Sequence, residues 1–192
     1  IEGIARSWML RDTPTSMRTG VIYAPSLGLF VAVGDASGTT THVMTSPNGL
    51  IWTNRTTPNI SLFDITWSED LGMLVAVGTG NAVLTSTDGL VWTQRTPSIS
   101  ADWRAVTWSQ DLGIFVAVSL LTSGNTYYAI SSDGITWTSG IIDAVNRNWE
   151  DICWSSELGL FVVVGESGSV VERIATSQLA YVPAFPPLGS EP

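Results

Sequence analysis

Short apolar runs alternate along the chain with polar, glycine-rich turns, and the same arrangement occurs four times. Each copy holds a continuous apolar run of four to six residues, such as Phe115 to Val118, rich in β-branched side chains and typical of a strand buried on both faces. An earlier strand ending in an aromatic residue leads into it through a Leu-Gly turn. Because glycine tolerates a positive φ at such turns, we predict one at Gly72, Gly113 and Gly159.

The copies have a period in the forties. The turn glycines at 28, 72, 113 and 159 are separated by 44, 41 and 46 residues. Such a period accommodates four strands and four turns, which is one blade of a β-propeller. Gly, Pro, Ser and Thr interrupt every window that could hold a helix. We therefore predict an all-β fold, a small β-propeller of four blades of four antiparallel strands, with repeats at about 15–56, 60–97, 101–142 and 147–181.

The most specific motif is the turn between the third and fourth strands of a repeat. Asn-Gly or Asp-Gly follows a serine and precedes a tryptophan by three residues in three of the copies. These dipeptides favour hairpins, and the Ser and Asp side chains can bond to neighbouring backbone amides. A structural turn is predicted at Asn48, Gly49, Trp52, Asp88, Gly89, Trp92, Asp133, Gly134 and Trp137.

These copies closely resemble the Asp-box, or BNR repeat, of sialidase-type β-propellers. The fuller phrase, with Trp-Ser-x-x-Leu-Gly before the apolar run, is also similar to repeats in structural proteins of phages and algal viruses. In the known families the Asp-box is chiefly a structural turn, usually away from the active face, so the resemblance implies a fold and not a reaction. Arg55 and Arg95 recur with the repeat and do not resemble the converged arginine triad of a sialidase.

The two ends of the chain complement each other. The last repeat lacks its Asp-box turn, whereas a segment starting at Trp8 parallels those that follow Trp52 and Trp92. We predict that an N-terminal strand, residues 4–12, completes the last blade, either within the chain or by swapping into a second copy. The Pro-rich arm, residues 182–192, cannot continue a sheet because proline lacks an N–H donor. Assembly contacts are predicted for Trp8, Tyr181, Phe185 and Leu188.

Composition narrows the classes of partner. The 192 residues include 17 acidic and 8 basic side chains, all eight of them arginine, for a net charge of −9. An acidic, Lys-free surface argues against nucleic acid and anionic membranes, and no apolar run reaches the roughly 18–20 residues of a membrane-spanning helix. One Cys and one His argue against a disulfide framework, a metal site or a catalytic triad, so no cofactor is expected. The initial Ile, with no visible signal peptide, is expected of a processed or partial chain.

The single cysteine and the single histidine both receive structural interpretations. Cys153 lies between Ile152 and Trp154 in an apolar strand, so we expect a buried, unreactive thiol. His42 follows a run of threonines, and we expect it at the surface.

Aromatic residues beside polar ones are the candidates for sugar binding. Trp103 and Trp149 precede the first strand of their repeats, where a connecting loop meets one face of the propeller; packing in the core or at the rim is the favoured alternative. The candidate glycan contacts are Asp102, Trp103, Asn148, Trp149 and Glu150. Two sequons make Asn54 and Asn59 candidates for N-glycosylation in a secreted protein.

Three functions follow from these patterns. Regular repeats and an open-ended last blade, without a catalytic cluster, favour a non-catalytic structural or assembly module of a fibre, filament or particle, extracellular or on a virion surface. Such a chain is expected to be no enzyme and to form a homo-oligomer through the N-terminal strand or the C-terminal arm. A glycan-binding propeller is the alternative. A glycosidase, which needs two carboxylates roughly 5–9.5 Å apart, comes third.

Overall fold

The computed structural model of the chain describes residues 9–10, 17–35, 42–143, 147–167 and 174–176. All regular elements in these residues are β-strands, apart from one short 3-10 helix, η1 (Pro25–Leu27). The prediction of an all-β chain is therefore confirmed.

Each sequence repeat forms one antiparallel sheet, here called a blade, whose strands pair in chain order. The first blade contains β1 (Met17–Ala24), β2 (Leu29–Asp35), β3 (Val43–Ser46) and β4 (Thr53–Arg55). The second blade contains β5 (Leu62–Ser68), β6 (Met73–Gly78), β7 (Val83–Ser86) and β8 (Thr93–Arg95).

The remaining repeats form the third and last blades. The third blade contains β9 (Trp103–Ser109), β10 (Ile114–Ser119), β11 (Thr126–Ser131) and β12 (Thr138–Asp143). The last blade contains three strands among the described residues: β13 (Arg147–Ser155), β14 (Leu160–Ser167) and β15 (Ile174–Thr176).

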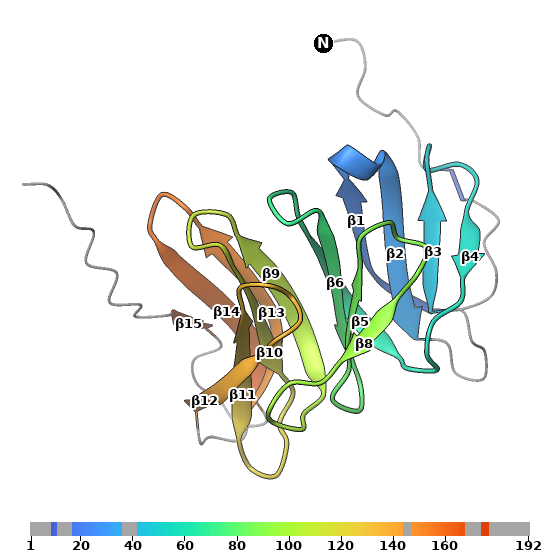
Figure 1. The fold of residues 1–192 in the computed structure, drawn as a ribbon. Coiled ribbons are helices and arrows are strands. Elements are labelled where there is room, and N and C mark those ends of the chain that lie inside the picture. Colours follow the sequence, from blue (N-terminus) through green and yellow to red (C-terminus); the bar gives the residue numbers. More distant parts are fainter. Residues whose placement is uncertain (1–8, 11–16, 36–41, 144–146, 168–173, 177–192) are drawn as a thin grey trace, which may run out of the picture.

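The blades follow one another along an arc, with the first and last blades at its two ends (Figure 1). The first strand of each blade packs on the first strand of the next, β1 on β5, β5 on β9 and β9 on β13. This arrangement of four antiparallel sheets is that of consecutive propeller blades.

The apolar runs bury their two faces against the two neighbouring blades. In the second blade, Leu74 and Ala76 pack against the first blade, whereas Val75 and Val77 pack against the third. Successive residues of a strand point to opposite faces, so a run that is apolar throughout serves both interfaces. The core is therefore a series of three apolar layers between blades.

The turn that joins the first two strands of each blade has the predicted backbone. Gly72, Gly113 and Gly159 have φ values of 56°, 62° and 63°. Gly28, at the end of η1, has a φ of 61°. The prediction of positive φ is confirmed.

A β-bulge that the sequence pattern did not predict recurs in the first strand of every blade. The register skips one residue at the same position each time: Thr19, Phe63, Arg104 and Glu150. A bulge redirects the side chain of the extra residue. Here the bulge residues reach the next blade: Thr19 donates to the Leu62 carbonyl at 2.9 Å, the Arg104 guanidinium lies 4.9 Å from the Phe63 ring centre, and Arg104 pairs with Glu150 at 2.7 Å.

Closure of the ring is not confirmed. Of the predicted closing strand only Met9 and Leu10 are described, and both are exposed and outside any strand. Trp8, the proposed assembly residues Tyr181, Phe185 and Leu188, and the Pro-rich arm lie outside the described residues. The N-terminal closing strand and the arm therefore stay predictions.

Two structural expectations are wrong. Cys153 is exposed, because it lies on the face of β13 that points away from the third blade, and no further blade covers that face among the described residues. His42 is 1% exposed, and its Nε2 lies 3.2 Å from Asn59 Oδ1 in the segment leading to the second blade.

Candidate functional site

The motif that resembles an Asp-box forms a turn in three blades, here called the Asp-box turn. In the second blade, the Ser86 hydroxyl accepts the Gly89 amide at 2.8 Å, and Asp88 Oδ1 accepts the amides of Leu90 and Val91 at 2.7 and 2.9 Å. Trp92 Nε1 then donates to the Gly89 carbonyl at 3.2 Å. The central glycines Gly49, Gly89 and Gly134 have φ near 70°. These groups satisfy one another, so the motif forms a structural turn.

The acidic residue of this turn is held in its ionised form. Two backbone amides donate to Asp88, and this lowers the pKa of its carboxyl. The amides of Thr136 and Ile135 lower the pKa of Asp133 in the same way. In the first blade Asn48 makes the equivalent bonds with its amide oxygen, at 2.9 and 3.1 Å. The turn therefore needs an acceptor and not a charge.

Both tryptophans proposed for glycan contact are buried. Trp103 is 0% exposed and Trp149 is 1% exposed. Trp103 Nε1 donates to Asn81 Oδ1, and Trp149 Nε1 donates to Thr126 Oγ1, each at 3.1 Å. Both tryptophans occupy the same place in the repeat as Leu62 of the second blade, which is also buried. Side chains at this place pack against the preceding blade. Packing in the core, which the sequence analysis favoured for both tryptophans, is therefore confirmed, and neither ring is accessible to a glycan.

The polar members of that candidate set also have structural partners. Asp102 accepts the Gly80 amide at 2.8 Å, and Asn148 Oδ1 accepts the Leu121 amide at 3.0 Å. Glu150 pairs with Arg104. These contacts tie connecting loops to neighbouring blades and do not converge on a shared cavity.

The two sequon residues differ in surroundings. Asn54 lies in β4 and is half-buried, and its Oδ1 has no partner among the described residues. Asn59 is exposed and contacts His42. Glycosylation at either residue stays a prediction.

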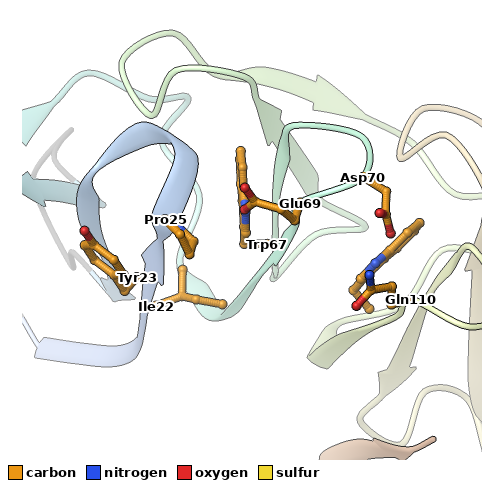
Figure 2. Close-up of a pocket in the computed structure, with 8 residues that line it drawn as sticks. Ile22, Tyr23, Pro25, Trp67, Glu69, Asp70 and Gln110 are labelled. Carbon is orange, nitrogen blue, oxygen red and sulfur yellow. The ribbon is translucent and has the colours of Figure 1, made fainter.

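A cavity of about 520 Å³ opens at the ends of β1, β5 and β9 (Figure 2). The first strands of the four blades, β1, β5, β9 and β13, are here called the inner strands. The first blade contributes Ile22, Tyr23 and Pro25. Its volume falls in the range of ligand pockets, roughly 300–1,000 Å³.

The second and third blades form the rest of this pocket, with Trp67, Glu69, Asp70, Trp108 and Gln110. Figure 2 shows Glu69 lying against Trp67 and Asp70 on the side of Gln110. Trp67 Nε1 donates to Glu69 Oε2 at 2.5 Å. The pocket thus combines apolar walls with two carboxylates and one amide.

One hydrogen bond expected from the repeat is missing at the pocket. In the last blade Trp154 Nε1 donates to Asp111 Oδ2 of the third blade at 2.8 Å. The equivalent pair is Trp108 and Asp70, yet Trp108 Nε1 has no partner among the described residues. Asp70 is left without a hydrogen-bonded partner in the same part of the chain, so its carboxylate is available to a ligand.

A half-buried carboxyl, that of Asp64, lies in the first strand of the second blade. Asp64, in β5, has a raised pKa because of its burial, although the amides of Val106 and Ile65 oppose this effect. Its two oxygens accept these amides at 2.9 and 2.8 Å. Because both oxygens are occupied, Asp64 joins the second blade to the third.

Among the described residues there is no group of three or more His, Cys, Asp or Glu side chains that could hold a metal ion. In the same residues no helix is long and apolar enough to cross a membrane.

Comparisons with solved structures identify the fold. The chain is similar to a streptogramin B lyase (12% identity, TM-score 0.63) over 79% of this chain and 49% of the lyase. It is also similar to the virginiamycin B lyase of Staphylococcus aureus (13% identity, TM-score 0.62) over 86% of this chain and 56% of that one. A GH43 β-1,3-galactosidase is more distant, with 13% identity and a TM-score of 0.49 over 76% of this chain and 65% of that one. No family model matches the sequence, and a search of curated proteins found no match.

These likenesses support a propeller fold, and the chain spans about half the length of the lyases. They also correct two predictions. The non-catalytic structural module and the absence of enzymatic activity are contradicted, because the propellers that this chain resembles are enzymes. The low identity transfers the fold and no reaction.

The sequence patterns did not predict this pocket. One feature of the sequence could have indicated it. The residue two positions after the aromatic end of the inner strand differs between repeats, as Glu69, Gln110 and Ser156. Such variation at one position of a regular repeat indicates a local role, and Glu69 and Gln110 do line the pocket.

Proposed function

We propose that the pocket between the first three blades binds a neutral carbohydrate. The observation that supports this most directly is the combination of aromatic walls with Glu69, Asp70 and Gln110 at one cavity. Aromatic and aliphatic surfaces pack against the C–H faces of a sugar ring. Carboxylate and amide groups accept hydrogen bonds from its hydroxyl groups.

The charge of the lining selects against other ligands. Among the described residues that line this pocket there is no Arg, and its two acidic side chains repel phosphate and carboxylate groups. Tyr23 is 45% exposed and adds a ring and a hydroxyl at one side. A hydroxyl-rich ligand without negative charge matches this lining.

A second candidate is hydrolysis of a glycosidic bond at the same pocket. It is favoured by the two carboxylates, since most glycosidases use an acid and a base or nucleophile on either side of the scissile bond. Glu69 lies against Trp67, whereas Asp70 lies apart from it near Gln110 (Figure 2). In this role Asp70, which has no protein partner among the described residues, is the better placed to contact the reacting sugar.

The test is a screen of the chain on an array of neutral glycans, followed by calorimetry with the best ligand. Asp70→Asn and Gln110→Ala are expected to weaken binding about tenfold, the equivalent of about 1.4 kcal/mol. Glu157→Gln is the matched control, because Glu157 occupies the Asp70 position of the last blade, away from the pocket. Absence of saturable binding to any neutral glycan, or equal loss in the control, contradicts the proposal.

Hydrolysis is checked separately by following release of reducing sugar from the bound glycan. Under the second candidate Asp70→Asn and Glu69→Gln lower the rate at least 100-fold, as expected for a general acid or base. Binding without turnover by the unchanged chain supports the binding proposal and rejects the hydrolytic one.

A further inference from the structure

Within the part of the chain that the structure describes, no blade covers one face of the first blade or the opposite face of the last blade. At the three junctions between consecutive blades, two faces of these kinds pack on each other. In the inner strands, Ile65, Val106 and Ile152 face the preceding blade and are 5%, 4% and 7% exposed. Val21 occupies the same position in the first blade and is 64% exposed.

The opposite face shows the same contrast in the last blade. Val33 and Val77 face the following blade and are 0% exposed. Val164 has their position in the last blade and is 40% exposed. Cys153 is exposed beside it, whereas Thr66 at the equivalent position is buried.

An aromatic cluster marks the free face of the first blade. In the third blade, the ring centroid of Phe115 lies 4.5 Å from that of Trp108 and 6.3 Å from that of Trp137. This aromatic cluster packs on the second blade. In the first blade, Phe30 lies 4.7 Å from Tyr23 and 6.5 Å from Trp52. The first cluster has the same construction, but no described residues of a preceding blade cover it.

The Asp-box glycines show which surface is missing. A Cβ on Gly134 would lie 2.6 Å from Met73 Sδ and 3.5 Å from Val75, both in the preceding blade. A Cβ on Gly89 would meet Val31 and Thr45 of its preceding blade. On Gly49 it would meet only Phe30 of its own blade. The residue that corresponds to Val31 and Val75 is Val162, on the free face of the last blade.

A polar contact completes the match. Asp64 accepts the Ile65 amide with one oxygen and the Val106 amide of the next blade with the other. Asp151 has the same position in the last blade and accepts the Ile152 amide at 2.8 Å. Its second oxygen has no partner among the described residues, and the amide equivalent to that of Val106 is the amide of Val21.

We propose that two copies of this chain form a head-to-tail ring, in which the last blade of each copy packs on the first blade of the other. Val21, Tyr23 and Phe30 of one copy then cover Val162, Val164 and Cys153 of the other, and Asp151 accepts the Val21 amide across the interface. A second copy is the occupant because the chain carries both halves of one interface. Two chains give eight blades, within the range of known propellers, and this chain aligns with about half of each lyase.

The first test is the mass of the 192-residue chain in solution by analytical ultracentrifugation. A species of twice the chain mass is expected. Val21→Asp and Val164→Asp are each expected to weaken its association at least 100-fold, since each places a charge in both interfaces of the ring. Val91→Asp is the matched control: Val91 is 69% exposed on the Asp-box turn of the second blade, away from both free faces.

Mixing the two variants distinguishes this arrangement from other dimers. A mixed pair of Val21→Asp and Val164→Asp chains keeps one unaltered interface, formed by the last blade of the first variant and the first blade of the second. Its other interface holds both aspartates, which repel each other, so the pair associates through the unaltered interface alone. The mixture is therefore expected to dimerise more strongly than either variant alone. Equal weakness of the mixture and the separate variants overturns the head-to-tail ring.

The single cysteine provides an independent reading. In the monomer Cys153 is exposed, whereas at high concentration the ring covers it and slows its reaction with a thiol reagent at least tenfold. The Val21→Asp chain, which keeps Cys153 unchanged, is expected to lose this protection. The ring is contradicted if the chain is still monomeric at about 100 µM, which is 100-fold above a micromolar Kd. It is also contradicted by a thiol reaction rate that does not depend on protein concentration, or by open-ended filaments.

Discussion

The second and third blades have nearly the same sequence pattern as the first and last blades, but their surroundings differ. Val106 of the third blade is 4% exposed and packs against the second blade, whereas Val21 at the same position of the first blade is 64% exposed. Phe115 is 0% exposed, and its equivalent Phe30 is only half-buried. The same residue type in the same strand thus contributes to stability only where a neighbouring blade covers it.

The largest expected difference lies between two phenylalanines. Phe115→Ala is expected to lower the free energy of unfolding by about 3–5 kcal/mol, because it leaves a cavity between the second and third blades. Phe30→Ala on the monomeric chain is expected to cost less than half as much. Urea unfolding followed by tryptophan fluorescence measures both. Equal losses would mean that the first blade is covered in the monomer after all.

A matched pair of valines sharpens the comparison within the inner strands. Val106→Ala is expected to cost about 1.5–2 kcal/mol, from the loss of buried methyl groups. Val21→Ala on the monomer is expected to change stability by less than about 0.5 kcal/mol, as at most exposed positions. The same unfolding experiment measures the pair, and a Val21 cost near that of Val106 would contradict an uncovered first blade.

The Asp-box glycines separate backbone strain from packing. Gly49→Ala is expected to cost about 1–2 kcal/mol, because φ is near 70° but space is available around the new methyl group. Gly134→Ala adds a clash with Met73 and is expected to cost more. Thermal unfolding of the two variants measures the difference. A Gly49 variant at least as unstable as the Gly134 variant would assign the cost to the backbone alone.

The smallest expected effect concerns the charge in the Asp-box turn. The folded-state pKa of Asp88 is lowered, so its ionised form contributes stability above the unfolded pKa of about 3.9, and this contribution is lost as pH falls through the lower folded value. Asp88→Asn keeps the acceptor, as Asn48 does in the first blade, and is expected to be nearly neutral at pH 7. Its stability should then fall less steeply than that of the unchanged chain below about pH 4. Unfolding midpoints at pH 3 to 7 check this, and identical pH profiles would contradict it.

Local features of the fold were predictable from the sequence. The turn at Gly72 needs a positive φ, and the turn at Asp88 needs an acceptor for two amides, so both follow from residues within one hairpin. The bulges were not predictable in this way, because Thr19, Phe63, Arg104 and Glu150 share no chemistry that identifies an extra residue. The candidate site was also missed, since its residues come from three blades and two of them had the appearance of core tryptophans.

The sequence by itself determined the repeat, the four apolar runs and the turns that connect them, because hairpin chemistry and two-face burial depend on neighbours a few residues away. Only the tertiary structure decided which faces are covered. That choice buries Trp103 and His42, exposes Cys153 and Val21, and brings Trp67, Asp70 and Gln110 to one cavity. The physical reason is that burial depends on contacts between blades roughly forty residues apart, and an identical strand gains or loses them according to its place in the arc.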